Sequence, residues 1–586
     1  MKTMINLKKL TVLTMGLLMF GVSCSDEFLE VLPTGSLADA QVGTKDGIEG
    51  LLIGTYSALN GVFGNRFEGP NHWVTGSIMG GEANKGTDAG DYSSINPIQR
   101  YEIDPTSGDI NQLWLGRFEG VSRANAVLAA LANATDVTAE DAARIGGEAR
   151  MLRAHFYFDL KKHFNSVPVF DETVEAVDVV TVPNTTEVYP QIEADLQFAY
   201  DNLPSTTDAG RVNKWAAAAL MGKAKLYQNK FAEAKTWFDD VIANGVTPSG
   251  EKYALLDNYA AIFNAEFDNN AEAIFDVESA NDTGSTQNAN YFDDLNYPYN
   301  TGPDGPGNCC GFFQPSISLG NSFRTSAGLP LLDDSFNDPA NQVADNFTFS
   351  QIDGGDEAAF VEDAGPLDPR IDHSIGRKGI PYLDWPGVDG VHPGSAWIRS
   401  FPYAGPYSPK KYVYYQSQEN SLTDGSSWTR GYALMNYTII RYADVLLMAA
   451  EAEIEAGTLD KALEYVNLVR ARAAKAEFWV KDADGTDAAN YDIAEYTSFP
   501  DKAYATAAVR FERKLELSGE GHAFFDLVRW GIAADYLNSY LAFEGSKLVT
   551  KFGGASFTAG KSEYYPIPQT QIDIQGSDVL TQNPGY

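Results

Sequence analysis

The sequence predicts a mainly α-helical protein, in which helical hairpins of the tetratricopeptide type form a scaffold that carries a large irregular insert. Residues 215–242 and 442–469 resemble each other, and each has the apolar spacing of two antiparallel helices. By contrast, residues 281–427 are rich in Gly, Pro, Asn, Asp, Tyr and Trp and show little helical periodicity. We therefore expect short strands, turns and ligand-binding loops in that stretch.

The two similar segments have small residues at matching positions. Ala224 and Ala452 precede a short turn, and Ala234 and Ala462 follow in the second helix. Small side chains there let two helices approach closely, although any amphipathic hairpin could show the same pattern. Further helices are predicted over residues 36–59, 110–131, 146–164 and 188–202, and a loop over 60–108. The helical scaffold then comprises residues 36–280 and 428–545 of a single domain, 36–586.

The composition restricts the partners. The 586 residues include 43 Lys and Arg against 79 Asp and Glu, a formal net charge of -36. Such an acidic chain repels nucleic-acid phosphates and favours uncharged ligands. Three cysteines are too few for a disulfide scaffold, and no Cys/His spacing is typical of zinc. We predict no cofactor, no metal site and no nucleic-acid partner.

The N-terminus has the pattern of an export signal. Lys2, Lys8 and Lys9 precede an apolar run over residues 10–20, and Ser23 stands directly before Cys24. This order is typical of a bacterial lipoprotein signal peptide, here residues 1–23, with lipidation at Cys24 and a tether over 24–35. The alternative is an ordinary secretory signal. A lipid would place the protein on a membrane without crossing it.

Several stretches in this order resemble the SusD/RagB family of surface glycan-binding lipoproteins. They are CSDEFLE, LWLGRFEGVSRAN, GEARMLRAHFYFDL, RYADVLLMAAEA, RFERKLELSGEGHAFFDLVRWG, YYPIP and TQNPGY. The resemblance implies a tetratricopeptide-like superhelix with a loop-built ligand face. It also implies an outer-membrane, cell-surface location and a SusC-type TonB-dependent transporter as partner. In that role the lipoprotein is a lid that captures oligosaccharide or polysaccharide and delivers it.

Two loop regions have the residue types that a sugar site needs. A sugar ring has an apolar face and a rim of hydroxyls, so its site combines aromatic rings with planar polar groups. The resemblance implies that both regions build the ligand site, while any single aromatic could instead pack into the core. The candidates are Trp73, Asp88, Asp91 and Tyr92 in the first region and Arg377, Trp385, Trp397 and Tyr407 in the second, where Tyr299 and Arg399 also lie.

Cys309 and Cys310 are adjacent in the turn-rich stretch GPDGPGNCCGFFQP. Neighbouring Cα atoms lie ~3.8 Å apart across a trans peptide, below the usual disulfide span of ~4.4–6.8 Å, so a bridge between them needs a special turn. On an oxidising surface they have no other thiol partner once Cys24 is lipidated. We predict a vicinal disulfide that offers a flat apolar platform to a sugar ring; the alternative is two free thiols.

Two other functions are compatible with the sequence. Glu516 and Glu520, four residues apart, could be the acid and base of an endo-glycosidase. Because Arg510 and Arg513 stand beside them, we interpret all four as a structural ion network and predict no enzyme activity. A peptide-capturing lid is the second alternative. The acidic chain favours a neutral glycan. The GGEANKGTD loop and the predicted cystine platform resemble those of fructan-binding relatives, and this resemblance implies a fructan such as levan.

Overall fold

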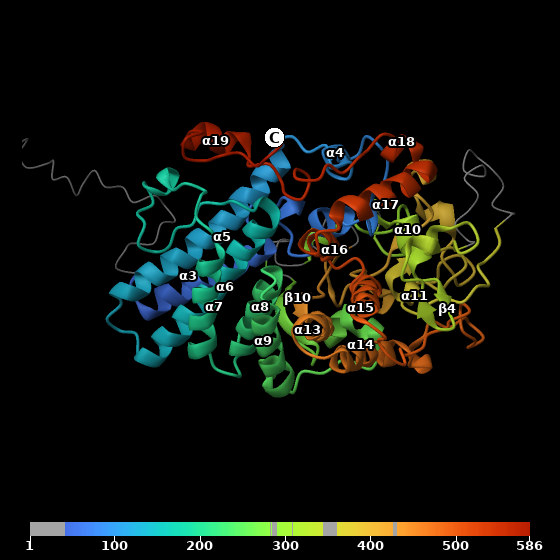
Figure 1. Cartoon of the computed structure of the whole chain (residues 1–586), viewed down its shortest axis with the longest axis horizontal. Coiled ribbons are helices and arrows are strands. Elements are labelled where there is room, and N and C mark those ends of the chain that lie inside the picture. The colour runs from blue at the N-terminus through green and yellow to red at the C-terminus, as the bar shows by residue number, and fades with distance from the viewer. Residues whose placement is uncertain (1–41, 282, 284–289, 308, 344–359, 426–430) are drawn as a thin grey trace, which may run out of the picture.

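The computed structural model describes residues 42–281, 283, 290–307, 309–343, 360–425 and 431–586 (Figure 1). The predicted signal peptide, Cys24 and the tether lie outside these residues. In the described part of the chain, none of the helices is both long and apolar enough to cross a membrane.

The N-terminal half is a stack of antiparallel helices, each packed on the next along the chain. Figure 1 shows the stack on its left side. Polar N-caps start several helices; Thr138 and Asn213 each accept hydrogen bonds from the first turn. The helices are α3 (Lys45–Ser57), α5 (Gly108–Asn133), α6 (Ala139–Phe164), α7 (Tyr189–Asn202), α8 (Lys214–Tyr227) and α9 (Phe231–Asn244).

The second hairpin continues this stack, although it lies far along the chain. Helices α13 (Tyr442–Ala456) and α14 (Leu459–Ala473) form the hairpin, and α13 packs directly against α9. Ala224, Ala234, Ala452 and Ala462 are all fully buried between helices. The predicted mainly α-helical, tetratricopeptide-like fold is therefore confirmed. The remaining helices are α15 (Lys502–Glu516), α16 (Ala523–Arg529), α17 (Ala533–Lys547), α18 (Val549–Phe552) and α19 (Gln569–Gln575).

A pair of strands joins the two ends of the insert. Strand β2 (Ala273–Val277) precedes the insert and pairs antiparallel with β10 (Tyr437–Arg441), which follows it. We call this pair the neck. The chain thus leaves the helical stack after α9, forms the insert, and returns through the neck to α13. The predicted limits of the insert, 281 and 427, lie between the two strands.

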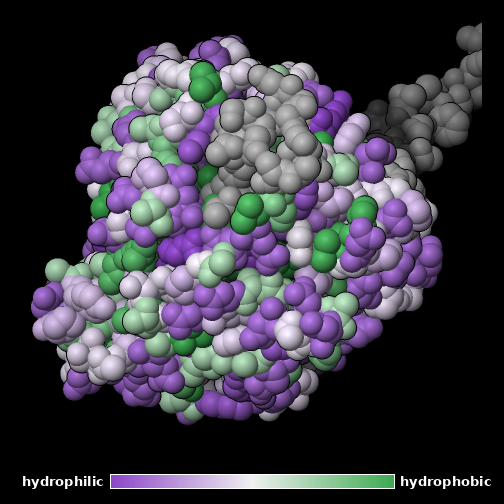
Figure 2. All heavy atoms as spheres, turned by 90° about the vertical axis from the view of Figure 1, so that its right-hand side faces the viewer, coloured by the Kyte–Doolittle hydropathy of each residue, from purple (hydrophilic) through white to green (hydrophobic). Residues whose placement is uncertain are grey.

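Within its described part, the insert has no helix longer than the six residues of α10. Short two-stranded pairs and turns make up the rest, on the right side of Figure 1. Figure 2 shows this end of the molecule, where polar residues dominate the surface and apolar residues form small separate patches. Its elements are β3 (Phe312–Pro315), α10 (Ile317–Ser322), β4 (Thr325–Ser326), β5 (Leu329–Pro330), α11 (Ile371–Ser374), β6 (Ile375–Gly376), α12 (Phe401–Ala404), β7 (Ser408–Pro409), β8 (Thr423–Asp424) and β9 (Tyr432–Ala433).

Residues 60–108, predicted as loop, contain regular structure. A π-helix, η4 (Trp73–Ile78), is followed by β1 (Ala83–Gly86) and α4 (Ile95–Ile98). At Gly76 a Cβ atom would lie 2.0 Å from the carbonyl oxygen of Gly521. Tertiary packing against a distant backbone therefore shapes this segment, and local periodicity does not reveal it.

A buried ion network joins the insert to the helices. Glu516, at the end of α15, accepts from Arg441 at 2.6 Å, from Arg370 of the insert at 3.0 Å, and from Arg472. Burial by itself would raise the pKa of Glu516, but the three guanidinium groups hold it well below its usual range. Glu520 is paired in the same way with Arg441. The predicted structural role of Glu516 and Glu520 is confirmed.

Candidate functional site

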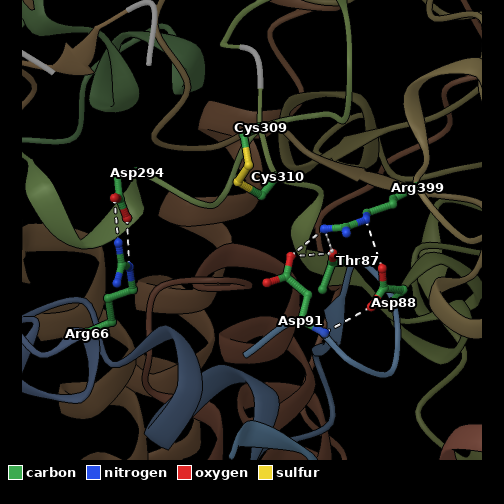
Figure 3. Close-up of a disulfide and its surroundings, with 8 residues drawn as sticks. All are labelled: Arg66, Thr87, Asp88, Asp91, Asp294, Cys309, Cys310 and Arg399. Atoms are coloured by element: carbon green, nitrogen blue, oxygen red, sulfur yellow. Dashed lines mark hydrogen bonds and ion pairs between the residues drawn. A yellow bond between two sulfur atoms is a disulfide. The ribbon is translucent and has the colours of Figure 1, made fainter. Parts of the chain in front are cut away.

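Strand pairing brings the two sequence-predicted loop regions together. Strand β1 pairs antiparallel with β3, so that Gly86 lies opposite Phe312. Directly beyond the pair, the backbone N–H of Thr87 donates to the carbonyl oxygen of Gly311 at 2.6 Å. The loop that follows β1 therefore lies beside Cys309 and Cys310, which precede β3 (Figure 3).

The loop after β1 is held in a tight turn by hydrogen bonds from its backbone to a carboxylate of the same loop. Asp88 accepts from the backbone N–H groups of Gly90 at 2.8 Å and Asp91 at 2.9 Å. Thr87 and Tyr92 have φ values of 49° and 40°, a left-handed conformation that non-glycine residues adopt only rarely. The Asp91 N–H is the main cause of a lowered pKa at Asp88, which is therefore ionised at neutral pH.

Arg399 of the insert reaches across to this loop. Its guanidinium lies 2.9 Å from the Asp88 carboxylate, 2.5 Å from that of Asp91 and 3.1 Å from the Thr87 hydroxyl. The same guanidinium lies over the Tyr299 ring, 5.6 Å from its centroid. A half-exposed aromatic ring, a cation and two carboxylates thus form one continuous surface.

Cys309 and Cys310 form a disulfide, and the peptide bond between them is cis. The backbone N–H of Cys310 donates to Leu295 at 3.3 Å, and that of Gly311 donates to Tyr297 at 2.9 Å. Cys310 is buried, whereas Cys309 is partly exposed beside the Arg399 cluster. The disulfide that we predicted is present in the structure, and its role toward a ligand is a separate question.

A second cation lies on the other side of the disulfide (Figure 3). Arg66 donates to both oxygens of Asp294, at 2.8 and 2.6 Å, and lies over the ring of Tyr291 at 5.3 Å. The hydroxyl of Tyr92 donates to Asp109 at 3.1 Å, and burial with this carboxylate raises the pKa of Tyr92. Sequence analysis did not identify Arg66 or Tyr291, although the run YFDDLNY at 291–297 has the composition of a sugar site.

We call the resulting face the junction surface, because it forms where the two regions meet. It has aromatic rings, ionised carboxylates, guanidinium groups and a disulfide within one area, and most of these groups are partly exposed. It consists of Arg66, Asp88, Asp91, Tyr92, Tyr291, Tyr299, Cys309, Cys310 and Arg399.

Five of the predicted ligand-contacting residues do not lie on this surface, and we do not include them in the proposed site. Their side chains are at most 3% exposed, so a ligand cannot touch them in this conformation. The described part of the insert has no long helices whose apolar faces could form a hydrophobic core, so large aromatic side chains form that core instead. The five residues are Trp73, Arg377, Trp385, Trp397 and Tyr407.

The contacts of these five residues explain their burial. Trp73 packs against Phe312 and Phe313, and Arg377 is held by both oxygens of Asp372 at 2.6 and 2.9 Å. The indole of Trp385 donates to the Tyr414 carbonyl oxygen at 3.0 Å. Trp397 lies edge-on to Tyr382 and His392, and Tyr407 packs against Gly320. These residues stabilise the insert from inside.

The carboxylate pair of the enzyme alternative is also buried. Glu516 is fully buried and Glu520 is 2% exposed, and arginines lower the pKa of both against the effect of burial. An ionised, ion-paired carboxylate has no proton to give a glycosidic oxygen. In the described residues, no three or more His, Cys, Asp or Glu side chains are grouped so as to hold a metal ion.

Comparison with known proteins places the chain in a family. The sequence model of the SusD family matches residues 271–586, more than half of the chain. A second model, described as starch-binding associating with outer membrane, matches residues 27–227. A SusD-like protein of Formosa agariphila, P25, is 25% identical over 544 residues, which cover 88% of this chain and 89% of that protein.

Solved structures agree on the fold. A SusD superfamily protein from Bacteroides vulgatus superposes with a TM-score of 0.67 at 20% identity, covering 92% of this chain and 99% of that one. Surface glycan-binding protein A from Bacteroides thetaiotaomicron, solved in complex with laminarihexaose, superposes with a TM-score of 0.61 at 20% identity and the same coverage. The chain belongs to the SusD family.

Proposed function

We propose that this protein is a cell-surface glycan-binding lipoprotein, and that the junction surface is its ligand site. The observation that carries the proposal is the contact between the loop after β1 and the Cys309–Cys310 turn, which the β1–β3 pair holds together. Tyr92, Tyr299 and the disulfide offer apolar faces to a sugar ring. Asp88, Asp91 and the two arginines offer hydrogen-bond partners to its hydroxyls.

The charge of the chain favours an uncharged glycan. At a net charge of -36, a uronate or sulfated chain is repelled over most of the surface. The sequence suggests a fructan such as levan. One structural neighbour is a laminarin-binding SusD-like protein and another holds laminarihexaose, so a neutral β-glucan is the second candidate.

We further propose that the protein is anchored through lipidated Cys24 in the outer membrane, facing outward. There it is the lid of a SusC-type TonB-dependent transporter, to which it delivers the captured oligosaccharide. The export pattern of the N-terminus and membership of the family support this part. Co-purification with such a transporter from membranes, and its loss when Cys24→Ala prevents anchoring, would test it.

Affinity electrophoresis tests the binding role. The purified protein runs in gels that contain levan, inulin, laminarin, starch or mannan, with polygalacturonate as the charged comparison. We expect strong retardation by one neutral glycan and none by polygalacturonate. Retardation by none of the neutral glycans, together with tight binding of peptides, would instead support a peptide-capturing lid.

The same samples test the endo-glycosidase alternative. After long incubation with the retarding glycan, we expect no new reducing ends and no shortening of the polysaccharide. New reducing ends released by the purified protein would contradict the binding-only role.

A further inference from the structure

A cavity between α15, α16 and α17 lies apart from the junction surface. Its volume is about 260 Å³, and none of the junction-surface residues lines it. An enclosed apolar cavity of about 150 Å³ already admits benzene, so this space is large enough for a small molecule. We call it the α15 cavity. Its apolar walls include Leu332, Phe336, Phe511, Leu517, Leu527, Trp530 and Ile532.

Two cations one helical turn apart on α15 line this cavity. The Lys514 ammonium is shielded from solvent and has no hydrogen-bond partner among the described residues. It lies 4.4 Å from the centroid of Phe336 and 5.6 Å from that of Tyr536. The Arg510 guanidinium lies over Trp530 at 4.9 Å, with no carboxylate of the described residues at ion-pair distance. Aromatic faces attract these cations but do not neutralise them.

Other cations close to this cavity are ion-paired. The neighbouring Arg513 contacts Asp444 at 2.7 Å and Asp526 at 2.8 Å, and Arg529 holds Glu451. The prediction that Arg510 joins the ion network of α15 is therefore wrong, whereas Arg513 is fully paired. Among the described residues, Lys514 and Arg510 therefore have aromatic neighbours but no carboxylate at ion-pair distance.

None of the carboxylates on the described cavity wall lies at ion-pair distance from these cations, although Lys514 acts to lower the pKa of Glu82 and Asp526 acts to raise that of Arg510. The Asp526 carboxylate forms ion pairs with the guanidinium groups of Arg513 and Arg529, at 2.8 Å from each. Asp334, at the exposed rim, accepts from the Ser539 hydroxyl at 3.1 Å. Glu82 accepts from the Gly519 backbone at 3.1 Å, and burial raises its pKa to about 7.

We propose that the α15 cavity binds a small organic acid as its carboxylate. Lys514 and Arg510 hold the carboxylate, and the apolar or aromatic body of the acid packs against Phe336, Phe511 and Trp530. The mainly apolar wall excludes a strongly hydrated dianion such as phosphate, whose dehydration two cations cannot offset. This site is independent of the proposed glycan site.

Calorimetric titration of the whole protein tests the proposal with benzoate, 3-phenylpropanoate and hexanoate, each beside its uncharged amide. We expect saturable binding of at least one acid, and binding of its amide at least about 10-fold weaker. Lys514→Met and Arg510→Met each remove one charge and keep a long apolar side chain. Each is expected to weaken acid binding about 10-fold.

Lys502→Met is the matched control, because Lys502 lies on the same helix but pairs with Glu455 at the surface. It should bind the acid as the unmodified protein does. Thermal unfolding of each variant establishes that it is folded. If Lys514→Met does not fold, Arg510→Met, at a half-buried position, tests the proposal alone. Glycan retardation should stay unchanged in all three. Equal binding of acid and amide, unaltered binding by both cation variants, or no saturable binding of any acid would overturn the proposal.

Discussion

Arg399 and Asp91 form an ion pair across 308 positions of the chain, at the surface where the insert meets the loop after β1. The same guanidinium contacts Asp88 at 2.9 Å. One side chain of the insert therefore fixes the two carboxylates of the other region. The geometry of the junction surface depends on this contact.

Replacing Arg399 by Met is expected to weaken glycan binding about 10-fold, or ~1.4 kcal/mol, in titrations with the glycan that retards the protein. The change removes a donor and releases the Asp88–Asp91 loop. Lys481→Met, which breaks the exposed Lys481–Asp487 pair, is the control and should leave affinity unchanged. Equal affinities of the two variants would show that Arg399 has no part in binding.

Intact-mass measurement of the native protein should show no alkylation at Cys309 and Cys310 before reduction. Reduction should then allow both thiols to be modified, because the two residues are bridged in the structure. Two modified thiols on unreduced native protein would contradict the bridge.

The Cys309→Ser/Cys310→Ser protein tests the platform role separately. We expect it to remain folded and to lose glycan affinity by about 5-fold or more, because a hydroxyl pair offers a sugar ring no flat apolar face. Thermal unfolding and titration measured on the same sample distinguish a lost platform from a lost fold. Unchanged affinity would exclude the disulfide from the site.

Glu516→Gln is expected to lower the free energy of unfolding by about 3–5 kcal/mol, since it removes one charge from a fully buried network and leaves three arginines undercompensated. Denaturant titration measures this difference. Glu464→Gln, at an exposed pair with Lys461, should change the value by less than about 0.5 kcal/mol. If Glu516→Gln lowered the free energy of unfolding as little as Glu464→Gln does, the ion network would not stabilise the attachment of the insert.

Glu544→Gln is expected to stabilise the protein progressively as the pH rises. Glu544 is fully buried, and burial raises its pKa to about 7. The same side chain ionises at about pH 4.3 in the unfolded chain, so the stability that this group contributes is fully present below that pH and is lost as the pH rises to about 7. Gln does not titrate and keeps the acceptor to the Ser318 N–H.

The difference between Glu544→Gln and wild type should therefore be near zero at pH 4 and on the order of 3–4 kcal/mol at pH 8. Unfolding at both pH values with Glu464→Gln in parallel measures it. A difference that does not depend on pH would contradict the raised pKa.

The helical scaffold could be predicted because its signals are local. Ala224 and Ala452 are small residues at the point where the two helices of each hairpin approach closely. The spacing of apolar residues along the chain predicted that these segments are helices. Trp385 and Trp397 could not be placed in this way. In a segment without periodicity, the sequence gives the composition of a binding face but does not distinguish a ring that meets a ligand from one that fills the core.

Contacts between distant segments account for the rest. Arg66 and Tyr291 come together through tertiary packing that no spacing in the sequence indicates. Arg510 has the helical spacing of an ion pair, yet the neighbouring acidic residues are occupied by Arg513 and Arg529. Spacing shows which groups can meet, but the competition among buried charges decides which ones do.

The neck between β2 and β10 brings the two ends of the insert to one place on the helical stack. The ends of the insert meet in one strand pair, and α9, which precedes the insert, packs directly on α13, which follows it. Loops of the insert that contact neither the helices nor β1 can therefore change in length or sequence, whereas Arg370 and β3 are fixed by their contacts with Glu516 and β1. Ligand preference can thus change through new residues on either side of the junction surface, in the insert or in the loop after β1, while the helical stack is retained.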